Sequence, residues 1–466
     1  MTSEIQVVVL AAGLGTRMKS RLPKVLHKAG GLPLIEHVIR TATEVTSPER
    51  ISVVVGYRAD LVEAALPHWP VRFVHQAEQR GTGHAVMMCR EAMAGRGGYV
   101  VVLYGDGPLL SAATVRRLID AQVAAAEHTA ATLIATTLDD PRGYGRVIVG
   151  EDGMVAAVVE EKAATPEQRA IRLVNSGIYC FRADLLCKYI DRLTPNPAAN
   201  EYYLTDLPEV MRPDGFYIAP LEIEDPTELL AINNRVELAE VDAIMRRRKA
   251  TELMLGGVTI EKPETVSIDA NVTMGIDCTV GPFAQILGDS RTGDNCSIGA
   301  SSIVRNCVLG DGVQIQPLTF VTDSRIEAGA QLGPFARLRP NNVVGENAFI
   351  GNFVELKNTR LGAGAKASHL TYLGDSEIGA KTNVGAGTIT CNYDGIRKHK
   401  TQIGEKAFIG SNSTLVAPVT IGDDSYVGAG SVITDEVPAG SLAIGRGRQV
   451  VKENWVEKRR NKVNLE

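Results

Sequence analysis

The chain has 466 residues, of which 44% are hydrophobic and 22% charged, and its formal net charge is -5. This length exceeds what one ordinary hydrophobic core serves, so two domains are expected, and the composition excludes a disordered chain. The acidic balance excludes a general nucleic-acid binder, because neutralising a phosphate backbone requires a basic surface.

The N-terminus and the cysteines indicate a compartment. Residues 1–4 lead into a short aliphatic run without the pattern of a secretory signal, and no stretch approaches the length of a membrane span. The cysteines form no C-x-x-C pair; they are Cys89, Cys180, Cys187, Cys278, Cys296, Cys307 and Cys391. We therefore expect a cytoplasmic protein with reduced cysteines and neither a zinc cage nor a disulfide framework.

The first 235 residues alternate aliphatic runs with helix-like segments. Runs at 7–10, 51–55, 99–103 and 131–136 predict strands, and 111–127 predicts a helix. This alternation is typical of an α/β domain with a mainly parallel, Rossmann-like sheet, in which ligands bind beyond the carboxyl ends of the strands.

Residues 236–256 predict a helical linker between two domains. Apolar residues at helical spacing are preceded by Glu237 and Glu240 and followed by basic residues at 246–249, an order that suits the helix dipole. The alternative is a last surface helix of the front domain. In either case a boundary lies here, with domains at 1–235 and 257–466.

The back half carries a six-residue repeat. One series of aliphatic residues is Ile326, Leu332, Leu338, Val344, Ile350 and Leu356, and a second is Ile403, Ile409, Leu415, Ile421, Val427 and Ile433. Six is not a helical period. Each hexad supplies one inward aliphatic and a small residue for the corner, which predicts a left-handed parallel β-helix of hexapeptide repeats. Such prisms expose flat faces that subunit neighbours commonly cover, so we expect an oligomer, a homotrimer.

A glycine-rich loop follows the first predicted strand. It reads Leu10-Ala11-Ala12-Gly13-Leu14-Gly15-Thr16-Arg17-Met18, and Pro23-Lys24 comes shortly after. Backbone N–H groups in such a loop can approach phosphate oxygens, while Arg17 and Lys24 add positive charge. The spacing is neither that of a Walker loop nor G-x-G-x-x-G, so the glycines alone are a weak signal.

Together with two further segments, this loop resembles the sugar-nucleotide pyrophosphorylase family. The segments are Gln76-Ala77-Glu78-Gln79-x-Gly81-Thr82-Gly83-His84-Ala85 and Tyr104-Gly105-Asp106. With the hexapeptide half, nearly the whole chain resembles the bifunctional N-acetylglucosamine-1-phosphate uridylyltransferase and glucosamine-1-phosphate acetyltransferase family. The resemblance implies synthesis of UDP-N-acetylglucosamine for bacterial cell-wall precursors, from sugar phosphates, UTP and acetyl-CoA.

The resemblance implies a set of residues for the uridylyl transfer. Those that would bind UTP or the UDP-sugar are Leu10, Ala11, Ala12, Gly13, Lys24, Gln76, Gly81, Thr82, Tyr104, Gly105, Asp106, Gly145, Glu160, Asn175 and Asn233. Asp106 and Asn233 would also ligate Mg²⁺, which prefers hard oxygen ligands. Arg17 and Lys24 would stabilise charge as the sugar phosphate attacks the α-phosphorus of UTP and releases pyrophosphate.

Alternatives remain for these residues. Lys24 could be a solvated lysine, Asp106 a strand-end cap, and Asn234 adjoins Asn233. The chain also departs from the family pattern: Leu14 stands where many members have Lys, and Gly107 where a larger residue is common.

The acetyl transfer needs a base, and His369 and His399 are the only histidines in the back half. A histidine near neutrality can accept the proton that the attacking amine loses. Segment 367–375 around His369 resembles the family's catalytic segment, whereas His399 lies in a hydrophilic insertion, 392–400. The alternative for His369 is a structural histidine.

The resemblance also implies binding residues in this half. For glucosamine phosphate these are Arg339, Lys357, Tyr372, Asn383, Asn392 and Tyr393, and for acetyl-CoA they are Ala386, Ser411, Ala429 and Arg446. The small residues could instead serve only packing, and Arg339 and Lys357 could be solvated charges. A further hypothesis is that Glu355 orients His369 across adjacent coils.

Two other functions stay open. The β-helix could be a trimerisation or allosteric module without chemistry, or the whole chain a sugar-phosphate sensor. The basic segment 455–462 could cover a phosphate of CoA or be a solvated tail.

Overall fold

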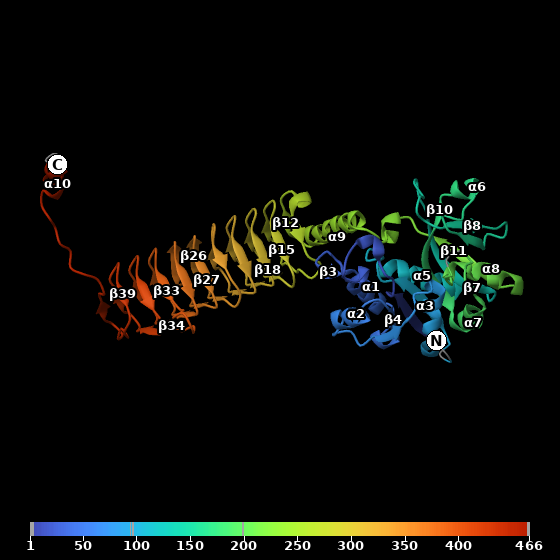
Figure 1. The fold of residues 1–466 in the computed structure, drawn as a ribbon, viewed down its shortest axis with the longest axis horizontal. Helices are drawn as coiled ribbons and strands as arrows, with labels where there is room; N and C mark the ends of the chain where they lie inside the picture. Colours follow the sequence, from blue (N-terminus) through green and yellow to red (C-terminus); the bar gives the residue numbers. More distant parts are fainter. Residues whose placement is uncertain (1–3, 94, 96, 198–199, 464–466) are drawn as a thin grey trace. The chain divides into compact units, whose positions relative to one another are not determined.

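A computed structural model describes residues 4–93, 95, 97–197 and 200–463 (Figure 1). The chain divides into two compact units, Met1–Met245 and Arg246–Glu466, each of which is considered by itself. They are termed the front unit and the back unit.

A nine-stranded sheet forms the centre of the front unit. The main order is β11, β7, β10, β6, β1, β4 and β5, with β8 and β9 paired beside β10. The strands are β1 Ile5–Leu10, β4 Ile51–Val55, β5 Arg72–His75, β6 Tyr99–Tyr104, β7 Thr129–Thr137, β8 Arg146–Val149, β9 Val155–Val159, β10 Leu173–Arg182 and β11 Tyr217–Glu222. Because β5, β4, β1 and β6 are parallel and β10 is antiparallel to its neighbours, the prediction of a mainly parallel sheet is confirmed.

Helices cover both faces of this sheet, which explains why its strands are aliphatic on both sides. The helices are α1 Leu34–Thr43, α2 Ala59–Ala65, α3 Thr82–Met88, α4 Arg90–Met93, α5 Ala112–Ala124, α6 Pro166–Arg169, α7 Ala183–Tyr189 and α8 Leu207–Met211. Val7 and Val9 of β1 belong to the core formed with α1, α2 and α5, whereas Val8 belongs to the core formed with α3, α7 and α8. Successive strand residues therefore face opposite layers of helices.

A helix, α9 Arg235–Leu255, occupies the segment whose charge order predicts one. Val241 packs in the front unit with Leu34, and Ala250 and Leu253 belong to the core of the back unit. The division between the two units falls inside this helix. Within the part of the chain described above, no helix combines the length and apolar character needed to cross a membrane.

The back unit consists of short parallel strands stacked into three sheets. The first sheet runs from β12 Thr259–Ile260 to β40 Leu442–Ala443, the second from β13 Ser267–Ile268 to β39 Val432–Ile433, and the third from β16 Arg291–Thr292 to β37 Val419–Ile421. All twelve aliphatic residues of the two hexad series are buried, with at most 6% of their surface exposed. The predicted hexapeptide-repeat β-helix is therefore confirmed (Figure 1).

Several strands of the first two sheets carry the side chains discussed below. In the first sheet these are β26 Phe349–Asn352, β29 Lys366–His369, β32 Asn383–Val384, β35 Phe408–Ile409 and β38 Tyr426–Val427; in the second they are β21 Phe320–Thr322, β24 Arg337–Leu338, β27 Glu355–Lys357, β30 Tyr372–Gly374 and β33 Ile389–Cys391. The last helix is α10 Trp455–Val463.

Candidate functional site

A cavity of about 640 Å³ opens in the front unit. The predicted nucleotide and sugar residues that line it are Leu10, Ala11, Ala12, Gly13, Arg17, Lys24, Gln76, Gly81, Thr82, Tyr104, Asp106, Gly145, Glu160, Asn175 and Asn233. They come from strand ends and loops distant in the sequence. This volume suits a small molecule of nucleotide-sugar size.

Leu10 and Tyr104, at the carboxyl ends of the neighbouring parallel strands β1 and β6, line the cavity. The Gly105 N–H, just after β6, donates a hydrogen bond of 2.9 Å to the Leu10 carbonyl at the end of β1, and the Ala11 N–H donates one of 2.9 Å to the Val54 carbonyl. Gly105 does not itself line the cavity but packs beside Leu10 and Ala11. The loop at 10–13 is thus fixed by hydrogen bonds that continue the ladder of the sheet.

Two cations, a carboxylate and an amide meet on one side of the cavity. Arg17 Nη2 donates to Asn233 Oδ1 at 2.8 Å, Lys24 Nζ donates to the same oxygen at 3.3 Å, and Lys24 forms an ion pair with Asp106. Since one ammonium contacts oxygens of both Asp106 and Asn233, these oxygens are close enough to ligate one cation, and they are of the hard type that Mg²⁺ prefers. The neighbouring Asn234 instead accepts N–H groups in the first turn of α9.

Gln76 presents an oriented amide at another part of the cavity. Its side chain is 3% exposed; Nε2 donates to the Gly81 carbonyl at 3.2 Å and lies 3.0 Å from Nδ1 of His84. Gly81 has φ 94°, and a Cβ there would lie 2.5 Å from the carbonyl oxygen of Tyr202. Only glycine fits this position, which brings Thr82 at the start of α3 to the cavity wall.

Glu160, Asn175 and Gly145 lie together in the wall. The Asn175 N–H donates to the Gly145 carbonyl at 2.9 Å, and Asn175 Oδ1 accepts the Gly177 N–H at 2.9 Å. Burial raises the pKa of Glu160 above its usual value. These groups offer a carboxyl and an amide to a polar, hydroxylated ligand.

Other lining residues were not predicted from the sequence. Tyr144, Glu201 and Tyr203 face the cavity, as do both departures from the family pattern, Leu14 and Gly107. Leu14 is 52% exposed. The signal that could have indicated segment 201–203 is its polar and aromatic composition shortly after Pro195 and Pro197 in the sequence.

His369 and the predicted acetyl-CoA residues share one edge of the β-helix. His369, Ala386, Ser411 and Ala429 each stand just before the left-handed corner residue of successive coils, and backbone hydrogen bonds link these corners, for example Asn412 N–H to the Ala386 carbonyl at 2.7 Å. Arg446 lies alongside the last of these corners. These four residues, His369, Ala386, Ser411 and Ala429, are termed the His369 column.

His369 is exposed, and one ring nitrogen has a specific partner among the described residues. Its Nδ1 lies 2.6 Å from Oδ1 of Asn352, which stands opposite it in the preceding coil. Because an amide oxygen only accepts, this contact assigns the proton to Nδ1 and leaves Nε2 with a free lone pair in the neutral ring. The imidazole can then act as a base through Nε2.

The expected contact between Glu355 and His369 is wrong. Glu355 pairs with Arg339 at 3.3 Å and with Arg337 at 3.9 Å. The stacking register explains the difference, since it aligns Glu355 with Tyr372 on the second sheet, whereas His369 ends a strand of the first sheet.

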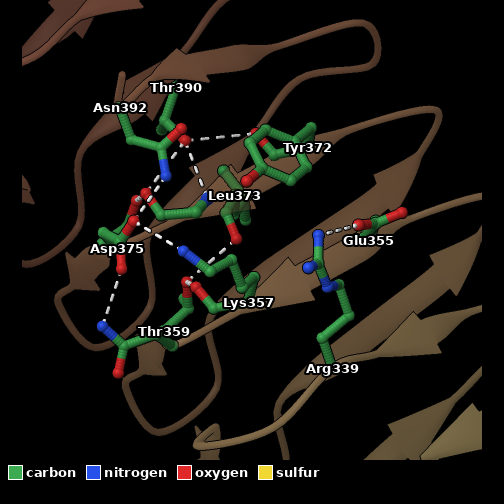
Figure 2. Close-up of polar contacts among 12 residues, drawn as sticks. Arg339, Glu355, Lys357, Thr359, Tyr372, Leu373, Asp375, Thr390 and Asn392 are labelled. Carbon is green, nitrogen blue, oxygen red and sulfur yellow. Dashed lines mark hydrogen bonds and ion pairs between the residues drawn. The ribbon is translucent and has the colours of Figure 1, made fainter. Parts of the chain in front are cut away.

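A polar cluster lies at the carboxyl ends of β27, β30 and β33 in the second sheet (Figure 2). Lys357 Nζ donates to Oδ2 of Asp375 at 3.1 Å, and Asn392 Nδ2 donates to the same oxygen at 2.5 Å. The missing side chain of Gly374 leaves space into which both the Tyr372 hydroxyl and the Asn392 amide extend. The structure thus brings together Lys357, Tyr372 and Asn392 around a carboxylate that was not predicted.

Positive charge dominates this cluster. Arg339 is paired with Glu355, and Lys398 of the insertion adjoins Lys357. A hydrogen bond to Lys357 and the positive charge of Lys357 lower the pKa of Lys398. Hydrogen bonds to Lys398 and, secondarily, to Asp375 raise the pKa of Lys357. Three cations against two carboxylates suit a dianionic phosphate. Lys398 also escaped prediction, although it lies in the noted insertion.

Asn383 and Tyr393 are not part of this cluster. Asn383 lies on β32 of the first sheet, and the Tyr393 ring is 60% exposed, with its hydroxyl donating to the Gly395 carbonyl at 2.5 Å. The insertion is held by Asp394, whose carboxylate contacts His399 Nε2 at 2.7 Å. His399 therefore has a structural partner within its own loop.

Comparisons with known proteins find related domains for both the front and the back unit. Residues 7–176 match the MobA-like NTP transferase domain, 291–316 match the hexapeptide repeat of succinyl-transferase, and 400–435 match the bacterial transferase hexapeptide (six repeats). The chain is 55% identical to the bifunctional protein GlmU of Solibacter usitatus, over 99% of this chain and 98% of that one. It is 47% identical to GlmU of Koribacter versatilis, over 97% of both chains. The chain therefore belongs to the family of the bifunctional protein GlmU.

Proposed function

We propose that the chain makes UDP-N-acetylglucosamine in two steps. The back unit transfers acetyl from acetyl-CoA to glucosamine 1-phosphate, and the front unit then transfers uridylyl from UTP to the N-acetylglucosamine 1-phosphate. The observation that carries the proposal is that one chain of this family holds two separate clusters, Lys24 with Asp106 and Asn233 in the front unit, and Lys357 with Tyr372 and Asn392 in the same unit as the His369 column.

In the uridylyl transfer, a phosphate oxygen of the sugar attacks the α-phosphorus of UTP. The bond from that phosphorus to its bridging oxygen breaks and pyrophosphate leaves. This chemistry requires positioning and charge neutralisation rather than a protein nucleophile. The cations Arg17 and Lys24 at the glycine-rich loop supply both, and the oriented amide of Gln76 suits the edge of a uracil base.

Asp106 and Asn233 would hold Mg²⁺, whose charge would offset that of the triphosphate and the leaving pyrophosphate. The convergence of their oxygens on the Lys24 ammonium supports this assignment. Lys24 would then pair with a phosphate in place of Asp106.

In the acetyl transfer, the amine of glucosamine 1-phosphate attacks the thioester carbonyl of acetyl-CoA. A C–N bond forms, the C–S bond breaks, and CoA leaves as its thiolate, which then takes up the proton that His369 has received from nitrogen. His369 accepts the proton from nitrogen through Nε2, an assignment supported by its Asn352 partner. Arg339 and Lys357 bind the phosphate, while small residues of the His369 column leave room for the pantetheine arm.

We also propose that the β-helix forms a homotrimer. Exposed apolar residues recur at the corner between the first two sheets; they are Phe283, Leu318, Phe335, Phe353 and Leu370, with exposures from 47% to 62%. The rings of Phe335 and Phe353 stack at 5.3 Å. Such a row is costly in water and suits coverage by a second copy. Sedimentation at micromolar concentration tests this assembly, and a monomer would contradict it.

One incubation tests the two activities. Protein, glucosamine 1-phosphate, acetyl-CoA, UTP and Mg²⁺ are combined and the products resolved by mass. We expect N-acetylglucosamine 1-phosphate, then UDP-N-acetylglucosamine and pyrophosphate. His369→Ala should lose acetylation and retain uridylylation of supplied N-acetylglucosamine 1-phosphate, and Lys24→Ala the reverse. If acetyl-CoA is not consumed, the β-helix is a trimerisation or allosteric module instead.

A further inference from the structure

One corner of the β-helix carries a row of Asn and Asp residues. Where the second sheet turns toward the third, the corner residues with left-handed φ are Asn306, Asp323, Asn341, Asn358 and Asp375, with φ between 44° and 69°. Asn and Asp tolerate this conformation better than other residues with side chains. Most of them are exposed, and a corner residue of this kind needs no role beyond forming the turn.

Asp323 shows what such a corner residue does when it is only structural. Its side chain is exposed, and its Oδ1 accepts one hydrogen bond of 3.0 Å from Nδ2 of Asn306 in the preceding coil. The same hydrogen bond between successive corner residues recurs three coils later, where Asp375 Oδ1 accepts a hydrogen bond of 2.7 Å from Nδ2 of Asn358.

Asp375 differs from Asp323 in its second oxygen. Asp375 is only 9% exposed, and its Oδ2 accepts both Lys357 Nζ at 3.1 Å and Asn392 Nδ2 at 2.5 Å (Figure 2). Lys357 belongs to the coil before Asp375 and Asn392 to the coil after it. One carboxylate oxygen therefore fixes two side chains that the stacking alone would leave independent.

Lys357 and Asn392 are residues that bind glucosamine 1-phosphate in the proposed function. Lysine has a long, flexible stem, so fixing its ammonium before the ligand arrives removes an entropic cost of binding. Beyond its contacts with Asp375 and Lys398, the Lys357 ammonium keeps one N–H group for a phosphate oxygen. The negative charge also offsets repulsion between Lys357 and Lys398, which adjoin each other.

We infer that Asp375 is a positioning residue for the acetyl acceptor, holding Lys357 and Asn392 at the separation that glucosamine 1-phosphate requires. The inference rests on the proposed acetyl transfer. It requires the carboxylate to remain charged: burial acts to raise the pKa of Asp375, but hydrogen bonds from Asn358, Lys357 and Asn392 outweigh it and leave the pKa below its usual value.

The test is Asp375→Asn in the full chain, with Asp323→Asn as the matched control at the same kind of corner. We expect Asp375→Asn to raise KM for glucosamine 1-phosphate at least about tenfold, because a charge-assisted contact is lost, while KM for acetyl-CoA and uridylyl transfer stay unchanged. kcat at saturation should fall much less than KM rises. Asp323→Asn should change none of these.

Unchanged KM for the sugar phosphate in a folded Asp375→Asn chain would overturn the inference, as would equal effects of Asp375→Asn and Asp323→Asn. A double-mutant cycle with Lys357→Met tests whether Asp375 acts through Lys357. In the Lys357→Met background, Asp375→Asn should raise KM little further, whereas fully additive effects of the two substitutions on KM contradict action through Lys357. If Asp375→Asn does not fold, Asp375→Glu keeps the charge, moves the oxygens, and carries the same KM test.

The two proposals fail separately. If the unaltered chain does not acetylate glucosamine 1-phosphate, the proposed function fails before any variant is compared. If it does, and KM is insensitive to Asp375, only the positioning inference fails.

Discussion

Polar contacts in the front cavity and in the β-helix cluster span very different distances along the chain. Lys24 and Arg17 reach Asn233 across 209 and 216 residues. In the β-helix, Arg339 reaches Glu355 across 16 residues, and Asp375 is reached by Lys357 across 18 and by Asn392 across 17. The front site thus depends on the complete α/β fold, whereas the back site depends on a few stacked coils.

This difference has a consequence for mutation. Repeats interact mainly with their nearest neighbours, so the loss of one polar contact in the β-helix should stay local. In the front unit, the loss of one group leaves partners from distant segments unpaired in the same cavity. Because both activities reside in one chain, each serves as the internal control for variants in the other unit.

The largest effect is expected for Asp106→Asn. The substitution keeps the shape but removes the charge that faces Lys24 and that would hold Mg²⁺, so uridylyl transfer should fall by at least about a hundredfold. Acetyl transfer by the same preparation should remain normal. Steady-state rates for both reactions check this, and retained uridylyl transfer would remove Asp106 from the site.

A smaller effect is expected at Arg339, where the chain offers a matched control. Arg337 and Arg339 both face Glu355, but only Arg339 is proposed to bind the phosphate. Arg339→Met should raise KM for glucosamine 1-phosphate about tenfold, since one charged hydrogen bond contributes about 1.5 kcal/mol. Arg337→Met should leave it within twofold. Equal shifts in the two variants would mean that the effect passes through Glu355 alone.

Periodicity predicted the β-helix well because one physical rule governs every coil. Each aliphatic residue in the two hexad series is buried, as a strand with one inward side chain requires. The predicted strands of the front unit also agree with β1, β4, β6 and β7, because a sheet covered on both faces needs continuous aliphatic runs.

Contacts between coils could not be predicted in the same way. Asp323 and Asp375 look alike in the sequence, and only the stacking shows that Asp375 also faces Lys357 and Asn392. The same limit explains the error at Glu355. The hypothesis placed Glu355 against His369 across adjacent coils, but the register of the sheets gives Glu355 the partner Arg339 instead.

Asp375 in the back unit and the half-buried Asp206 in the front unit have pKa values shifted in opposite directions. Three hydrogen-bond donors hold Asp375. At Asp206, by contrast, burial and the nearby negative charges of Glu209 and Glu160 raise the pKa to about 6. Because the folded pKa lies above the unfolded value, the stabilising effect of the protonated form is present at low pH and is lost as pH rises through about 6.

Asp206→Asn should therefore stabilise the front unit at pH 8 by about 1 kcal/mol, after discounting the full shift for partial exposure, and should have little effect near pH 4. Thermal unfolding across this range measures the difference. Asp120→Asn, at an exposed position on α5, is the control and should show no such pH dependence. A gain that is equal at both pH values would point to packing rather than charge.

The smallest effect is expected from restoring a cation at Leu14, the exposed residue that lines the cavity beside the glycine-rich loop. Leu14→Lys should lower KM for UTP by no more than about fivefold, because an ion pair at an exposed position contributes at most about 1 kcal/mol. Salt should weaken the gain, since the added charge is open to solvent. Leu22→Lys adds the same charge at another exposed leucine, 39% exposed and outside the cavity lining, and separates a local contact from a change in net charge. Equal gains from both variants would show that the net charge of the front unit, rather than a local contact, attracts UTP. The contrast with the β-helix cluster, whose contacts join neighbouring coils, would then be weaker than the sequence separations suggest.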